Sequence, residues 1–361
     1  MSSKYIADSD ECFLVTGANG FIGTKVVDCL LEYGFTNIRC FVRHSSKLGN
    51  LQRTLDKHSA PSTVTLVVGD LLSREDCQNA VLDVSVIIHL AAGFDKSFAG
   101  AFMNSALTTR NLLDAFLQYG RPRRFVNVSS FAVYSNLGLK RGSILDETCP
   151  LENAPQERFD AYGFGKLQQE KMVKDYGRKH KLPYVIVRPG AVFGPGKRDL
   201  SGRVGINTFG FFIQVNGSQP LPLSFVDNCA EAIVLAGLTP GIDGEVFNIV
   251  DDEPLSGRQF LKAYNKKTGG FSVRIPYAIA YLFCLLWEEY AKRSKNQLPP
   301  AFNRRRCAAE WKSNYYSNRK AREQLDWKPR VPMQKAMEAF LSQFGSNGND
   351  DAIKAEALER S

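Results

Sequence analysis

Tyr162 and Lys166 stand four residues apart, which places their side chains on one face of a helix. A free tyrosine has a pKa of about 10 and is a poor base at neutral pH. An ammonium group near the phenol favours the phenolate, and so does an oxidised nicotinamide. The pair therefore predicts a tyrosine that exchanges a proton with an alcohol or ketone. Ser130, which follows an apolar run, is expected to hydrogen-bond the reacting oxygen.

A glycine-rich turn at residues 16–23 follows a short apolar run and opens a predicted helix. Gly17 permits the tight turn, Gly20 lets the backbone approach a pyrophosphate, and Gly23 lets the helix pack closely. The first amides and the positive dipole end of that helix would face the phosphates. The residues of this turn that we predict to bind the cofactor are Gly17, Asn19, Gly20, Phe21, Ile22 and Gly23.

The end of the second apolar run indicates which dinucleotide binds. An acidic residue there would bind a ribose 2′-hydroxyl and repel a 2′-phosphate. Residues 40–47 contain no acid, whereas Arg43 and Lys47 can pair with a 2′-phosphate. We therefore expect NADP(H) to be favoured over NAD(H). Residues that follow later strands are also expected to contact the cofactor: Asp70, Leu71, Ala91 and Ala92.

Strand and helix patterns alternate through the first half of the chain. Continuous apolar runs predict strands at residues 12–16, 38–42, 64–68, 84–90, 125–128 and 184–187. Helices are expected at residues 21–33, 98–119 and about 158–176. Alternation of this kind predicts an α/β fold, a Rossmann-type doubly wound parallel sheet with helices on both faces.

The predicted organisation has four parts. Residues 1–10 form an N-terminal tail and residues 11–189 the NAD(P)-binding Rossmann domain. Residues 190–344 form a smaller substrate-binding part, and residues 345–361 a flexible tail. Within the third part, residues 224–238 and 246–249 are regular enough to return to the main sheet.

The composition of the chain indicates which kinds of partner it binds and in which cellular compartment it works. The chain has 361 residues, 44% of them hydrophobic, which is ample for a sizeable core. Its net charge of +9 is accompanied by no zinc-finger or RNA-binding signature, so we expect no nucleic-acid partner. The eight cysteines are scattered and the four histidines lack metal-ligand spacing, which predicts reduced thiols and no metal. The N-terminus lacks an apolar signal core, and we expect a cytoplasmic protein.

These motifs resemble those of the extended short-chain dehydrogenases/reductases, in the NAD(P)-dependent epimerase/dehydratase superfamily. The resemblance runs from about residue 12 to residue 344. It includes the segments 16–23, 89–92, 128–134, 162–166 and 188–196. It implies that Ser130 is catalytic and that Asn127, Tyr134 and Pro189 line the cofactor side. It also implies a homodimer that pairs through the helices at 98–119 and 158–176.

The resemblance leaves more than one function open. Sugar-nucleotide enzymes usually carry an arginine just before a Phe-Val-x-Asp strand, to grip a diphosphate. Residues 221–228 contain no arginine, although Lys197, Arg198 or Arg203 could substitute. The 3β-hydroxysteroid dehydrogenase-like branch is therefore favoured, with an NADP(H)-dependent oxidoreductase that interconverts a secondary alcohol and a ketone. The alternatives are an NDP-sugar epimerase and a non-catalytic NADP-binding regulator.

An apolar run at residues 275–287 is too short to cross a bilayer, which needs about 20 residues. Lys292, Arg293 and Lys295 follow it. An apolar helix with aromatic residues and a basic flank suits a membrane surface or the roof of an apolar pocket. The expected partners are therefore a small-molecule substrate, apolar in character, and a membrane surface contacted peripherally through residues 275–295. A helix packed on the core is the alternative.

Overall fold

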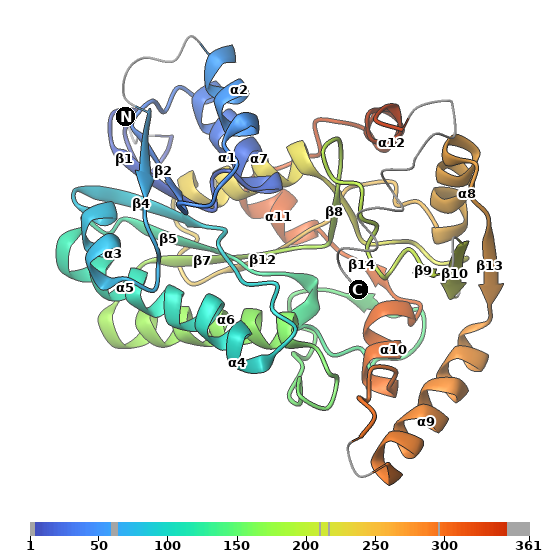
Figure 1. The fold of residues 1–361 in the computed structure, drawn as a ribbon. Helices are drawn as coiled ribbons and strands as arrows, with labels where there is room; N and C mark the ends of the chain where they lie inside the picture. Colours follow the sequence, from blue (N-terminus) through green and yellow to red (C-terminus); the bar gives the residue numbers. More distant parts are fainter. Residues whose placement is uncertain (1–3, 59–63, 209–210, 216, 295–296, 345–361) are drawn as a thin grey trace.

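A seven-stranded parallel sheet forms the centre of the protein, in the order β12-β7-β5-β4-β1-β2-β3 (Figure 1). The computed structural model describes residues 4–58, 64–208, 211–215, 217–294 and 297–344. The strands are β1 Cys12–Thr16, β2 Ile38–Val42, β3 Val64–Val68, β4 Val84–His89, β5 Arg124–Val128, β7 Tyr184–Pro189 and β12 Val246–Ile249. Every strand pair in this sheet is parallel. The predicted doubly wound α/β fold is confirmed.

Helices cover both faces of the sheet, as Figure 1 shows. One face carries α1 Phe21–Glu32, α2 Gly49–Lys57 and α7 Val226–Leu238. The other carries α3 Arg74–Val81, α4 Phe98–Ala101, α5 Thr108–Tyr119 and α6 Ala161–His180. A π-helical segment, Phe102–Leu107, joins α4 to α5. The helices α2 and α3 were not predicted from the sequence.

Burial on both faces explains the apolar run of the central strand β1. In β1, Phe13 and Val15 belong to the core beneath α1 and α7. Cys12 and Leu14 point the other way, into the core beneath α3 and α5. Successive side chains of a strand alternate between faces, so a strand between two layers must be apolar at every position.

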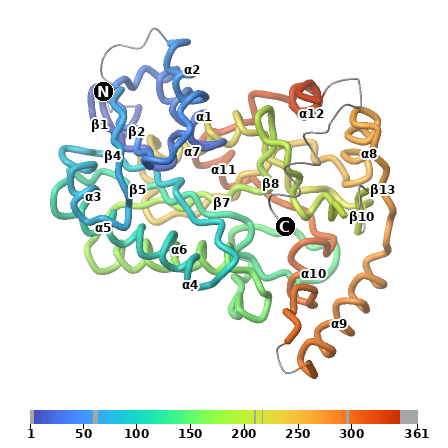
Figure 2. Tube along the Cα trace, in the orientation of Figure 1, coloured from blue at the N-terminus to red at the C-terminus, as the bar shows by residue number. Residues whose placement is uncertain are grey.

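The remaining part of the chain packs beside the carboxyl ends of the strands (Figure 2). Its strands are β6 Ile144–Leu145, β8 Ala191–Phe193, β9 Ile206–Thr208, β10 Phe211–Val215, β11 Leu223–Phe225, β13 Ser272–Ile275 and β14 Tyr315–Tyr316. Its helices are α8 Gly257–Thr268, α9 Tyr277–Arg293, α10 Arg304–Trp311, α11 Arg319–Gln324 and α12 Met333–Ser342. Within residues 224–238, β11 pairs with β8 outside the main sheet, and α7 returns to cover that sheet.

A buried ion pair fastens α6 to the sheet. Arg188, in β7, donates from Nε and Nη2 to the two carboxylate oxygens of Glu170, in α6, at 2.8 and 2.6 Å. Both side chains are only 2% exposed. The Ser129 hydroxyl, at the end of β5, donates to the same carboxylate at 2.6 Å. The carboxylate therefore connects one helix to the ends of two neighbouring strands.

Removal of Arg188 would leave the buried Glu170 carboxylate with only the Ser129 hydroxyl and the half-exposed Lys174, 3.6 Å away. We expect Arg188→Met to lower the free energy of unfolding by about 3–5 kcal/mol, measured by urea denaturation. The matched control is Arg178→Met, because Arg178 forms an exposed pair with Asp175 in the same helix. An exposed pair contributes about 0–1 kcal/mol. Equal losses in the two variants would contradict this role for Arg188.

Candidate active site

The glycine turn lies between the carboxyl ends of β1 and β4, where the strand order of the sheet reverses. Ligands of open α/β sheets bind at such a point. Gly17 has φ +70°, which a residue with a side chain rarely adopts. A Cβ atom on Gly23 would collide with the Gly17 carbonyl oxygen. Glycine is therefore required at both positions for the first turn of α1 to meet β1.

The same turn fits the phosphates of a dinucleotide. Gly20 is the N-cap of α1, and among the described residues no side chain caps the first amides of this helix. Those amides can therefore bind an anion. Asn19, Phe21 and Ile22 lie half-buried around the turn.

The other residues predicted to bind the cofactor follow the carboxyl ends of β2, β3, β4 and β7. Arg43 and Lys47 are exposed in the loop after β2, and no ion pair of the described residues involves them. Asp70 is exposed and Leu71 is buried after β3.

Ala91 follows β4 and donates its amide to the Thr16 hydroxyl at 3.3 Å. This contact brings Ala91 beside Gly17, and Ala92 follows it. Pro189 lies buried at the end of β7, which β5 separates from β4.

The predicted proton-transfer residues converge where β5 ends. Tyr162 lies in the first turn of α6, where Asp160 caps the helix by accepting from the Gly163 amide at 2.8 Å. Ser130, just after β5, lies close enough to the phenol of Tyr162 to lower its pKa. Lys166, one turn further along α6, donates from Nζ to the Val128 carbonyl at 2.7 Å. Three residues from two segments are thus held at one strand end.

The pKa of the Tyr162 phenol in the protein alone is raised, whereas we expected from the sequence that it would be lowered. Burial raises the pKa of Tyr162 to about 12 and outweighs the opposing effect of Ser130. Burial also lowers the pKa of Lys166 to about 7, although Glu170 opposes that change. The protein alone therefore does not produce a phenolate at neutral pH, because desolvation disfavours both charged forms.

Phe94 is a further candidate site residue, which the sequence did not indicate. Its ring stacks on that of Tyr162, with centroids 5.0 Å apart and planes 4° apart. The Phe94 side chain is nevertheless 84% exposed. It lies in the loop after β4, where no periodic pattern or motif would single out one aromatic residue.

A buried polar network supports α6 from behind. His89 contacts the Thr16 hydroxyl through Nδ1 at 2.8 Å and the Thr109 hydroxyl through Nε2 at 2.9 Å. Gln169 of α6 donates to the same Thr109 hydroxyl at 2.8 Å. Complete burial lowers the pKa of His89 to about 3, so this histidine is neutral and structural.

The two remaining residues implied by the resemblance differ in their surroundings. Asn127 is fully buried, and neither polar atom of its amide has a hydrogen-bond partner among the described residues. The Tyr134 hydroxyl donates to Asn248 at 2.7 Å and accepts from Arg188 at 2.8 Å. Tyr134 therefore links β7 and β12 through its hydroxyl.

The chain is similar to a known protein family and to several curated proteins. Residues 13–249 match the model of the NAD dependent epimerase/dehydratase family. A 3-beta-hydroxysteroid dehydrogenase of Mycolicibacterium neoaurum is 28% identical over 92% of this chain and 90% of its own length. The mouse sterol-4-alpha-carboxylate 3-dehydrogenase, decarboxylating, is 25% identical over 94% of this chain and 92% of its own length.

The fold is shared with a solved sugar-nucleotide enzyme. UDP-glucuronic acid 4-epimerase from Bacillus cereus, in complex with NAD, superposes with a TM-score of 0.67 and 22% identity. The match covers 92% of this chain and 98% of that one. The family match covers more than half of the chain and includes both the glycine turn and the Tyr162–Lys166 pair. The chain belongs to the NAD dependent epimerase/dehydratase family and is an NAD(P)-dependent oxidoreductase of the extended short-chain dehydrogenase/reductase type.

Proposed function

We propose that this protein interconverts a secondary alcohol and a ketone with NADP(H), Tyr162 serving as acid and base. The observation that carries the proposal is that Ser130 lies beside the phenol of Tyr162, one helical turn before Lys166. The carboxyl ends of parallel strands meet at one edge of a sheet, so this group and the glycine turn share that edge.

Each polar residue has a distinct task in this proposal. In the oxidative direction, Tyr162 accepts the proton of the alcohol while the Ser130 hydroxyl orients the same oxygen. When bound, the dinucleotide supplies the hydride acceptor or donor and, in its oxidised form, a positive charge that favours the phenolate. Lys166, which is 3% exposed, would hold the nicotinamide ribose and stabilise the phenolate. In the reductive direction Tyr162 returns its proton to the oxygen.

Two reactions remain candidates. The named activities of the bacterial and mouse relatives favour oxidation of a 3-hydroxysteroid or a similar apolar alcohol. An NDP-sugar epimerase would instead return the hydride to the same molecule. The segment before β11 argues against it, because Leu221 and Pro222 stand where an arginine would grip a diphosphate. A homodimer and a cytoplasmic location stay predictions.

The test of this function is NADP⁺-dependent oxidation of a 3β-hydroxysteroid, followed by the appearance of NADPH. Tyr162→Phe should lower kcat by about 10²–10⁴-fold, because it removes the acid/base group. Its affinity for NADPH should match that of the unaltered protein, which serves as the folding control. Substantial residual turnover would remove Tyr162 from the proposed role. Binding of UDP, dTDP or GDP without any steroid oxidation would favour the epimerase.

The proposed preference for NADP(H) depends on Arg43 and Lys47. Arg43→Ala should weaken NADPH binding by about tenfold and leave NADH binding unchanged, because a charge-assisted contact to the 2′-phosphate is lost. Arg53→Ala removes the same charge from the nearby α2 and should change neither affinity. Tighter binding of NADH than of NADPH by the unaltered protein would contradict the preference.

The helix α9 supports the proposed membrane contact. Only Ala280, Cys284 and Ala291 are buried in it, and none of the described helices is long and apolar enough to cross a membrane. Figure 1 shows α9 along the outer edge of the protein, with α10 on its inner side. Five apolar side chains at helical spacing are at least 50% exposed: Ile279, Leu282, Phe283, Leu286 and Tyr290. The exposed Arg293 and the net charge of +9 complement an anionic lipid surface.

Cosedimentation with vesicles of phosphatidylserine and phosphatidylcholine tests this contact. Leu286→Glu should lower the partition coefficient between vesicles and water by at least about tenfold, since burial of a leucine contributes about 1.5–3 kcal/mol. Val68→Glu alters a residue of the edge strand β3 that is 49% exposed, and it should have no effect. Loss of self-association in Leu286→Glu, with no vesicle binding by the unaltered protein, would show that a second copy covers α9.

A further inference from the structure

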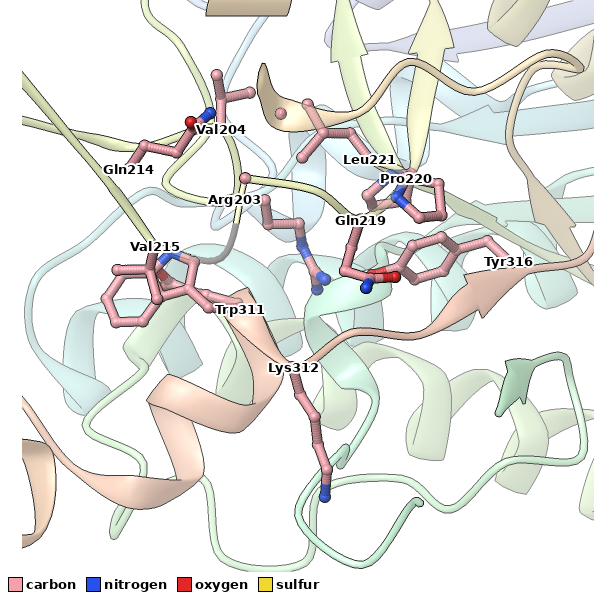
Figure 3. Close-up of a pocket in the computed structure, with 14 residues that line it drawn as sticks. Arg203, Val204, Gln214, Val215, Gln219, Pro220, Leu221, Trp311, Lys312 and Tyr316 are labelled. Atoms are coloured by element: carbon pink, nitrogen blue, oxygen red, sulfur yellow. The ribbon is translucent and has the colours of Figure 1, made fainter. Parts of the chain in front are cut away.

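A small apolar core joins α9 to α10 at the outer edge of the protein (Figure 1). Its buried members are Val215 of β10, Ala280 and Cys284 of α9, and Cys307 and Trp311 of α10. Figure 3 shows the Trp311 side chain beside Val215, where α10 meets β10. Each of the two helices thus contributes one cysteine to this α9–α10 core.

The two thiols of the α9–α10 core lie close to each other. Both are free thiols in the structure. The Cys307 thiol lowers the pKa of Cys284, whereas Cys284 and burial raise the pKa of Cys307. No other described cysteine has a second cysteine among the groups that shift its pKa. Two cysteines can be bridged only where their side chains meet, so this pair is the one placed for a disulfide among the described cysteines.

The surroundings of the pair make Cys284 the better nucleophile. The thiolate is the reactive form of cysteine, and a neighbouring cation favours it. The Cys307 thiol lowers the pKa of Cys284, and so does the charge of Arg306. Burial and the carboxylates of Glu288 and Glu310 oppose this shift without outweighing it. Cys307, whose pKa is raised, stays a thiol that can react with an oxidised Cys284.

An oxidant must reach these thiols through α9. Cys284 is 2% exposed and Cys307 is fully buried. Most of α9 is not buried, and a helix held by few buried side chains opens locally at a low cost in free energy. Local opening of α9 would therefore admit a small oxidant to Cys284 without unfolding the central sheet.

A covalent bond would change how firmly α9 is held. In α10, Arg305 donates to the buried carboxylate of Glu152 at 2.9 Å, which anchors this helix to the segment before α6. The ion pair that joins α9 to α10, between Glu288 and Arg304 at 3.1 Å, is partly exposed and contributes little. A disulfide between the two helices would therefore fix α9 against the anchored α10.

We propose that Cys284 and Cys307 form a reversible intramolecular disulfide when the protein meets hydrogen peroxide. The Cys284 thiolate attacks one peroxide oxygen, the O–O bond breaks, and a sulfenic acid and a hydroxide ion form. The Cys307 thiol then attacks the sulfenic sulfur, and its proton leaves with the sulfenic oxygen as water. The two sulfur atoms lose two electrons in all, which the peroxide gains. The disulfide is independent of the proposed reaction, since neither thiol takes part in it.

The experiment treats the folded full chain with hydrogen peroxide and then removes the oxidant with catalase. Iodoacetamide in urea blocks the remaining thiols, and trypsin digests the protein without reduction. Basic residues flank both cysteines, so trypsin separates residues 275–292 from residues 307–312. Mass spectrometry should find these two peptides joined and lighter by two hydrogen atoms than their sum. Dithiothreitol should release them as separate peptides.

Cys149→Ser is the matched control, because Cys149 is the one cysteine of the chain that is not buried. It should give the same yield of joined peptides as the unaltered protein. Cys307→Ser should give none, and its Cys284 should be trapped by dimedone as the sulfenic acid. The unaltered protein alone decides the outcome if a variant fails to fold.

Oxidation should also raise the Tm of the unaltered protein by a few degrees, because the bond restricts the unfolded chain. Cys284→Ser should show no such rise. Recovery of both cysteines as alkylated thiols after peroxide treatment would overturn the proposal. Joined peptides that form only when peroxide is added in urea would do the same, since the folded protein would then not bring the two thiols together. Conversion of Cys284 to a sulfinic acid without joined peptides would also contradict it.

Discussion

The carboxylate of Glu170 lies inside the protein, where an unpaired charge would destabilise the fold by several kcal/mol. Arg188 and the Ser129 hydroxyl satisfy it. Glu170 comes from α6, Arg188 from β7 and Ser129 from the end of β5, so one carboxylate fixes the helix of Tyr162 against the strand end of Ser130. The proposed proton transfer thus depends on a charge that takes no part in the chemistry.

The central sheet could be predicted because a strand buried on both faces is a continuous apolar run between turn residues. The helices α2 and α3 could not, since they bury few side chains: Leu51 and Thr54 in α2, and Cys77, Ala80 and Val81 in α3. The helix within residues 224–238 was hard to recognise for the opposite reason, because nearly all of its side chains are buried. The helix α7 packs beside α1 on the sheet and is buried nearly all round, so no polar face reveals its period.

The glycine turn and the Tyr162–Lys166 pair were predictable because their chemistry depends on local spacing. Cys284 and Cys307 belong to different helices and meet only in the folded structure. No spacing rule connects them. The raised pKa of the Tyr162 phenol could not be predicted from the sequence either. It results from desolvation, which depends on packing around Tyr162 that the order of residues does not reveal.

The exposed ring of Phe94 has a thermodynamic consequence for whatever binds beside Tyr162. Its inner face is occupied by the tyrosine ring, and most of its remaining surface is in contact with water. A ligand that covers this ring would remove apolar surface from solvent. Its association would then show a negative heat-capacity change, because the release of water from Phe94 would become part of the binding free energy.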